Sequence, residues 1–130
     1  MDNTIKEHIA KLTKFLEDCG TKISPLPKVV LRKDVNESSN FLGKTGYYEP
    51  ENQSIVLYTA GRHPKDIVRS YAHELYHHHQ NLNGNLKQAA SESADPKYAQ
   101  NSKALRRIEA EAYMKGNLWF RDYCDSVKYK

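Results

Sequence analysis

The sequence predicts an α+β fold in a single domain that spans residues 1–130. Three observations carry this prediction: an amphipathic opening stretch, short β-branched and tyrosine-rich runs in the middle, and two longer helical patterns in the second half. A chain of 130 residues is long enough for one buried core and too short for two ordinary domains. We expect an N-terminal helix, a small twisted sheet of about three strands, and two further helices.

The first helix is expected from Thr4 to Cys19. Thr4 and Glu7 have the spacing of a capping box, and Gly20 is a natural end for the helix. The apolar side chains recur every three or four residues, at Ile5, Ile9, Leu12, Leu16 and Cys19. This spacing predicts that one face of the helix packs on the rest of the domain.

Three short strands are expected next. The run 29–32 has strand composition, and the runs 46–48 and 53–59 are interpreted as a hairpin around a turn that contains Pro50. The polar residues 34–44 are interpreted as a loop. Residues 55–59 are expected to form an edge strand that a peptide could extend by β-augmentation; an ordinary sheet strand is the alternative.

Two more helices complete the prediction. Pro64 suits the first turn of a helix that runs to about Gln80, and Asp66 suits its positive N-terminal end. The polar stretch 81–102 is expected to be irregular, either a lid or an insert. A last helix is expected over 103–123, followed by a short basic tail.

Composition narrows the class of protein. The net charge is +4, but the lysines and arginines are scattered, which favours a solvated basic surface over a nucleic-acid site. No apolar run approaches the roughly 20 residues of a membrane span, and the first residues lack the pattern of a secretory signal. Cys19 and Cys124 stand alone, without metal-site spacing. We expect a cytoplasmic protein with reduced thiols and no membrane partner.

The segment His73-Glu74-Leu75-Tyr76-His77 matches the pattern H-E-x-x-H. On a helix, His73 and His77 project from one face and can bind the same tetrahedral metal ion. Glu74 lies about 100° further round, within reach of a metal-bound water. The apolar arc of this helix neighbours the histidine arc, and it consists of Ile67, Val68, Tyr71, Ala72 and Leu75. Both histidines are therefore expected at the edge of the core.

A zinc site of this kind needs a third protein ligand, which we expect from the last helix. On a helical wheel, Glu109 falls in the middle of the apolar side and Glu111 on the opposite side. A carboxylate on an apolar face is costly unless it is paired or bound to metal. Glu109 is therefore preferred over Glu111. The alternative for Glu109 is a salt bridge, with Lys103, Arg69 or Arg106 as the partner.

The other histidines are expected to be structural. His78 and His79 fall on the apolar arc and should be packed and hydrogen-bonded, without binding metal. His63 precedes Pro64 and is interpreted as a loop or helix-cap residue, and His8 as a surface residue of the first helix.

At these motifs the chain resembles the gluzincin-type metallopeptidases, in which HExxH is completed by a glutamate from a later helix. The closer likeness is to minimal single-domain forms often found in phage and bacterial genomes. Residues 70–77 are similar to their active-site helix, and Ile108-Glu109-Ala110-Glu111-Ala112 resembles their E-x-x-A segment. The resemblance implies a zincin-like fold with Glu109 as the third ligand. Tyr113 departs from the acidic or amide residue of many relatives, which leaves the outer shell of His73 or His77 unassigned.

The resulting hypothesis is a zinc-dependent metallopeptidase that acts on a peptide or protein. One Zn²⁺ per chain is expected on His73, His77 and Glu109, with Glu74 as the general base that takes the water proton. An oxyanion donor is also expected, and four residues qualify by type: Tyr113, Tyr123, His78 and His79.

Two other functions stay open. The chain could be a zinc-stabilised binding or regulatory module with little or no hydrolytic activity, although Glu74 argues against a purely structural site. It could also be a basic, metal-free interaction protein in which the motif is accidental. That reading predicts no zinc and a salt-sensitive affinity for nucleic acid.

Overall fold

The computed structural model describes residues 2–33, 46–84 and 103–128. Within these ranges it is an α+β structure with three helices and a small mixed sheet, which confirms the predicted class. The predicted loop 34–44 and most of the predicted irregular stretch 81–102 lie outside these residues. No helix in the described part is long and apolar enough to cross a membrane. The elements in order are α1 (Asp2–Asp18), β1 (Lys28–Arg32), β2 (Gly46–Glu49), β3 (Ser54–Tyr58), α3 (Pro64–Leu82) and α5 (Lys103–Lys128).

The start of α1 differs from the prediction. The helix begins at Asp2, so Thr4 lies inside its first turn and the predicted capping box is wrong. The side chain of Glu7 instead pairs with Lys11 one turn later, at 3.0 Å. The helix therefore begins two residues earlier than predicted, and Glu7 lies in its second turn.

The end of α1 is the predicted one. Gly20 has a φ of +83°, and its amide donates to the carbonyl of Glu17 at 3.0 Å, while the amide of Thr21 donates to the carbonyl of Leu16 at 3.0 Å. These two bonds form a Schellman motif, which requires the left-handed conformation that glycine adopts easily. Cys19 lies past the last turn and is exposed, so it does not extend the apolar stripe.

The sheet has the order β1-β3-β2, with β1 parallel to β3 and β2 antiparallel to it. The hairpin of β2 and β3 is as predicted. The prediction of an edge strand at 55–59 is wrong, because β3 is hydrogen-bonded on both sides and its residues 55–58 are all buried. A central strand has no free backbone groups for a peptide, so β-augmentation at this strand is excluded.

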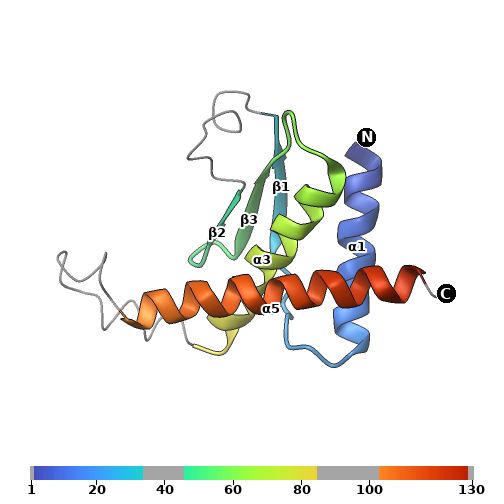
Figure 1. Ribbon diagram of the computed structural model, residues 1–130. Coiled ribbons are helices and arrows are strands. Elements are labelled where there is room, and N and C mark those ends of the chain that lie inside the picture. The colour runs from blue at the N-terminus through green and yellow to red at the C-terminus, as the bar shows by residue number, and fades with distance from the viewer. Residues whose placement is uncertain (1, 34–45, 85–102, 129–130) are drawn as a thin grey trace.

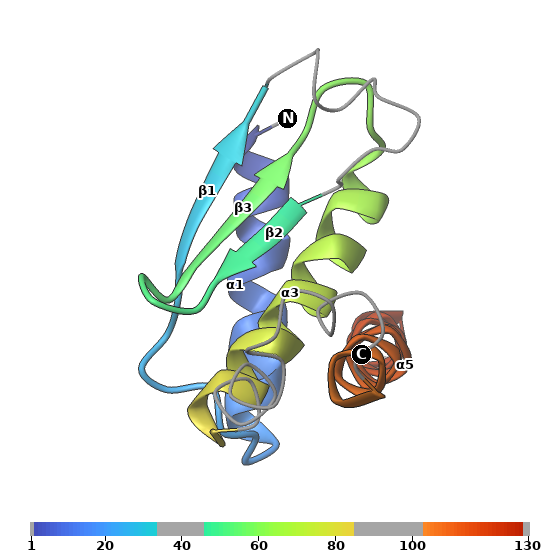
Figure 2. The ribbon, with the colours of Figure 1, turned by 90° about the vertical axis from the view of Figure 1, so that its left-hand side faces the viewer.

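Two helices cover one face of the sheet, and the third crosses one of them. Helices α1 and α3 lie behind the same face of the sheet in Figure 2, while α5, seen nearly end-on there, lies beside α3 and crosses it (Figures 1 and 2). Helix α3 is therefore central, in contact with α1, α5, β2 and β3. The predicted apolar arc of α3 is fully buried, together with Ile5, Leu12 and Leu16 of α1 and with Phe120 and Tyr123 of α5. Residues on the side of α3 that faces α5 thus lie in the interface between these two helices.

Helix α3 starts as predicted, and helix α5 ends later than predicted. His63 is the N-cap of α3, and its Nδ1 accepts a hydrogen bond from the amide of Lys65 at 3.1 Å. Pro64 occupies the first turn, as predicted. Helix α5 continues to Lys128, beyond the predicted end at Tyr123. No glycine or proline interrupts residues 124–128, so the expected tail begins as helix.

Candidate metal centre

Helix α3 presents the two motif histidines on one face. Their ring centroids lie 4.9 Å apart, with the rings nearly perpendicular. The side chain of His73 is 27% exposed and that of His77 is 9% exposed. Glu74, between them, is 7% exposed. The two imidazoles therefore lie at the edge of the core, as predicted, and Glu74 is more deeply placed than a surface carboxylate.

Helix α5 brings Glu109 to this pair. Its carboxylate oxygens lie 3.8 Å from Nε2 of His73 and 3.4 Å from Nε2 of His77. One ligand atom from each of these residues lies within 4.8 Å of the other two. The side chain of Glu109 is nevertheless 67% exposed. Glu109 therefore lies beside both histidines, as expected. Because its side chain is mostly exposed, the cost of burying an unpaired carboxylate does not explain this position.

Glu111 does not lie on the solvent side, as the helical wheel predicted. Its carboxylate accepts a hydrogen bond from the hydroxyl of Tyr76 on α3, at 2.6 Å. The ring of Tyr76 also packs on Trp119, with 4.8 Å between the centroids. Glu111 therefore links α5 to α3 through Tyr76, whereas Glu109 lies beside His73 and His77.

A close approach of the two helices makes the cluster possible. Gly116 of α5 is buried against the backbone of α3, where a Cβ atom would lie 2.8 Å from Cα of His73. Only glycine fits such a crossing without displacement of one helix. Because Glu109 precedes Gly116 by about two turns, it lies on the same face of α5 and reaches both imidazoles.

The charges of the cluster support one another. The imidazoles of His73 and His77, which lie beside the carboxylate, hold the pKa of Glu109 well below its ordinary range. Burial lowers the pKa of His77, whereas Glu109, Glu74 and Gln80 raise it, and together they leave this pKa above its ordinary value. Burial raises the pKa of Glu74 against the opposing effect of both histidines. The site thus combines an ionised carboxylate with a neighbouring carboxyl group of higher proton affinity.

One residue of the site was not found from the sequence. Gln80 lies on α3 and is 1% exposed, and its Oε1 accepts a hydrogen bond from Nδ1 of His77 at 2.9 Å. Its Nε2 donates to the backbone carbonyl of Ile108 on α5 at 3.1 Å. The available signal was a glutamine three residues after the second motif histidine, which places it on a neighbouring part of the helix surface.

The candidate oxyanion donors are dispersed. Tyr123 bonds to Nδ1 of His8 at 3.1 Å, which also makes His8 less of a surface residue than expected. His78 and His79 are hydrogen-bonded to backbone carbonyls of the loop before β1, as the structural interpretation predicted. Tyr113, one helical turn after Glu109, is 68% exposed. Its role stays a prediction.

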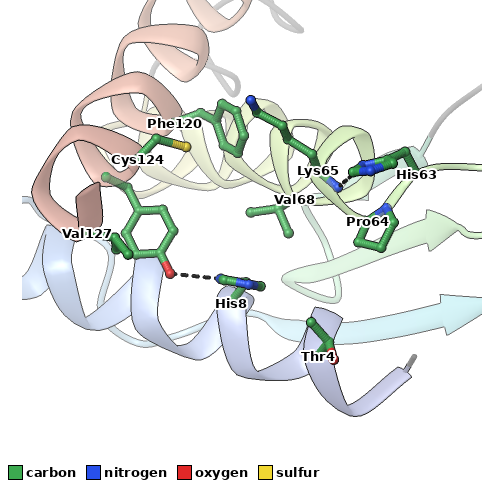
Figure 3. A pocket seen from close by; sticks show the side chains of 10 residues that line it. Thr4, His8, His63, Pro64, Lys65, Val68, Phe120, Cys124 and Val127 are labelled. Carbon is green, nitrogen blue, oxygen red and sulfur yellow. Dashed lines mark hydrogen bonds between the residues drawn. The ribbon is translucent and has the colours of Figure 1, made fainter.

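A cavity of about 340 Å³ lies elsewhere in the molecule. It opens among α1, the first turns of α3 and the last turns of α5 (Figure 3). Its walls are mostly apolar, with Val68, Phe120 and Val127 among them, and the hydrogen bond of His8 with Tyr123 runs along one side. None of the three clustered residues lines it. It is a packing gap between three helices, separate from the candidate metal centre.

Comparisons of the chain with known protein families, with curated proteins and with solved structures find no match. The site is therefore interpreted from its own residues and their geometry.

Proposed function

We propose that this protein is a zinc-dependent metallopeptidase of the zincin-like, gluzincin type. The observation that carries the proposal is the convergence of Nε2 of His73, Nε2 of His77 and the carboxylate of Glu109 beside the buried Glu74. The order of elements supports it, since a small sheet precedes the HExxH helix and the glutamate helix crosses that helix.

The donor set fits zinc. Two imidazole nitrogens and one carboxylate are the protein ligands of many catalytic zinc sites, which keep a fourth position for water. Ligand atoms around a tetrahedral zinc ion lie roughly 3.3 Å apart, given bond lengths near 2.0–2.2 Å. The distances of 3.4 and 3.8 Å from Glu109 to the two imidazoles are close to that value. The three ligand atoms all lie within 4.8 Å of one another, so the side chains would have to draw together around one zinc ion per chain.

The residues have distinct roles in this proposal. His73, His77 and Glu109 hold the metal, which when bound lowers the pKa of a water molecule and polarises the substrate carbonyl. The carboxylate of Glu74 takes a proton from the attacking water and delivers it to the leaving amine nitrogen as the peptide C–N bond breaks. The pKa of Glu74, raised by burial, suits a group that must hold that proton between the two events.

The proposed substrate is a peptide or protein, and the proposed location is the cytoplasm. Cys19 and Cys124 are both free thiols, which agrees with a reducing compartment.

The test is the zinc content of untagged protein by elemental analysis, after dialysis against metal-free buffer and refilling with one equivalent of zinc. We expect about one zinc per chain in the wild type and much less in His77→Ala and Glu109→Ala. Glu111→Ala is the matched control, because it removes a carboxylate from the same helix that also contacts α3. It should keep the zinc.

Two outcomes would contradict the proposal. Wild-type protein without zinc would remove the metal centre and favour the basic interaction protein. Equal zinc loss in Glu109→Ala and Glu111→Ala would mean that α5 matters for packing alone and that Glu109 is no ligand.

A further inference from the structure

Gln80 is a buried polar residue whose hydrogen bonds link both parts of the proposed zinc site. It is only 1% exposed, and a buried amide needs hydrogen-bond partners to replace the water that it loses. Both ends of its amide have a partner: Nδ1 of His77 on its own helix, and the carbonyl of Ile108 on α5. Ile108 directly precedes Glu109, so one side chain touches a ligand imidazole and the backbone beside the ligand carboxylate.

These partners fix the orientation of the amide. A backbone carbonyl can only accept a hydrogen bond, so the group that faces Ile108 must be the amide nitrogen of Gln80. The amide oxygen then faces His77, and it can only accept. Nδ1 of His77 must therefore carry the hydrogen, which leaves the lone pair of a neutral ring on Nε2. Nε2 is the atom that faces the carboxylate of Glu109.

The adjacent imidazole has the opposite arrangement. The carbonyl of Pro25 can only accept, so Nε2 of His78 carries the hydrogen and donates to it at 2.7 Å. Nδ1 of the neutral ring then accepts from the hydroxyl of Tyr48 at 2.7 Å, and that hydroxyl accepts from Asn81 at 3.0 Å. Two consecutive histidines of one helix thus hold their ring hydrogens on different nitrogens. The tautomer is set by each ring's partner and not by the helix.

We propose that Gln80 is a positioning residue of the zinc site. It holds His77 in the tautomer that binds metal through Nε2, and it fixes the backbone of α5 one residue before Glu109. This inference rests on the proposed function, because it concerns the same ligands. Outer partners of this kind orient metal-bound histidines, and their removal typically weakens metal binding about 10–100-fold.

The test compares three variants at matched positions. Gln80→Met keeps the approximate volume and removes both hydrogen bonds. Gln80→Glu keeps an oxygen that can accept from Nδ1 of His77. Asn81→Leu removes the neighbouring amide of the same helix, which contacts Tyr48 and the carbonyl of Pro50 and not the zinc site. Circular dichroism establishes that each variant is folded.

Two quantities are measured. Zinc affinity is obtained by competition with a chromophoric chelator, and the tautomer of His77 by long-range ¹H–¹⁵N spectra of zinc-free protein at alkaline pH. We expect Gln80→Met to bind zinc about 10–100-fold more weakly than the wild type. Asn81→Leu should stay close to the wild type. Gln80→Glu keeps the acceptor for His77 but loses the donor to Ile108, so its zinc affinity should lie between those of the wild type and Gln80→Met. The hydrogen of His77 should lie on Nδ1 in the wild type and shift toward Nε2 in Gln80→Met.

Several results would overturn the inference. A wild-type spectrum with the hydrogen of His77 on Nε2 would do so even if Gln80→Met failed to fold. Wild-type zinc affinity in Gln80→Met, or equal weakening in Gln80→Met and Asn81→Leu, would reduce Gln80 to a packing residue while the zinc enzyme stood. Wild-type protein that binds no zinc would instead remove the proposed function, and this inference with it.

Discussion

Gly116 of α5 lies against the backbone of His73, so the two helices are in backbone contact at one of the proposed metal ligands. A Cβ atom at position 116 would lie 2.8 Å from Cα and 3.1 Å from the amide nitrogen of His73. These are backbone atoms of a buried helix, which cannot rotate away as a flexible side chain could. The spacing of α3 and α5, and hence the position of Glu109, depends on the absence of a side chain here.

Gly116→Ala should therefore destabilise the protein. In an exposed helix interior this change usually stabilises by about 1 kcal/mol, but the overlap with His73 should reverse the sign, to a loss of about 1–3 kcal/mol. Urea unfolding measures the difference, and zinc affinity should fall in the same variant. Lys115→Ala, at the neighbouring exposed position, should stay within about 0.5 kcal/mol of the wild type. A more stable Gly116→Ala would show that the helices do not meet as described.

Zinc should stabilise the folded protein, because its proposed ligands come from two helices that separate on unfolding. Free zinc at about 100 times its dissociation constant should add about 2.7 kcal/mol, or roughly 10 °C in Tm. Calorimetry with zinc and with excess chelator measures the shift. Glu109→Gln should lose most of it, while Glu111→Gln should have a lower Tm in both conditions and an unchanged shift. A zinc-dependent shift of wild-type size in Glu109→Gln would contradict the ligand assignment.

Glu74→Gln should keep its zinc and lose its activity. General base catalysis typically contributes 10²–10⁴-fold, so peptide turnover should fall by about that factor. The measurement is mass spectrometry of a mixture of unstructured peptides incubated with each protein, alongside zinc analysis of the same samples. Residual cleavage equal to that of the wild type would mean a contaminating protease, and the zinc-stabilised binding module would then be the better account.

Tyr71 should make stability depend on alkaline pH. Burial raises its pKa to about 12 from an ordinary value of 10.0. The folded state thus holds this proton more tightly than the unfolded state, so the contribution is complete below pH 10 and is lost as pH rises toward 12. Urea unfolding at several alkaline pH values should show a smaller decline in Tyr71→Phe than in the wild type. Tyr113→Phe, at an exposed ring, should leave the decline unchanged.

The same variant should also be less stable at neutral pH. Thr13 donates to the carbonyl of Ile9 at 2.7 Å, so its hydroxyl accepts from the hydroxyl of Tyr71, at 2.5 Å. Tyr71→Phe leaves that buried acceptor without its donor, at a cost of about 1–3 kcal/mol. If stability fell as steeply with alkaline pH in Tyr71→Phe as in the wild type, the buried position of the Tyr71 hydroxyl would be contradicted.

The elements that could be predicted from sequence have local causes. The end of α1 at Gly20 and the start of α3 at Pro64 follow from the backbone preferences of these two residues. The buried faces of the helices follow from the helical period of 3.6 residues. The pairing of β1 with β3 has no such local signal, because another strand separates these segments in the chain. The continuous apolar run of β3 from Ile55 to Tyr58, however, is typical of a buried central strand.

The candidate site divides in the same way. The HExxH motif identifies its helix because the spacing of His73 and His77 is itself local. A helical wheel treats a whole face as equally buried, whereas crossing helices touch over a short length. This explains why Glu109 is mostly exposed, and why Glu111 bonds to Tyr76 when the wheel placed it in solvent. Gln80 was missed because its partner on α5 is fixed only by the docking of two distant segments.

The run His77-His78-His79 would look like the start of a metal-affinity tag in an extended chain. In the folded protein both ring nitrogens of His78 are occupied, by Tyr48 and Pro25, and both of His79 by Lys22 and Asn83. Only His77 of this run directs a ring nitrogen toward Glu109. Retention of untagged protein on immobilised nickel should therefore grow as the chain unfolds, and would serve as a simple assay for its misfolded fraction.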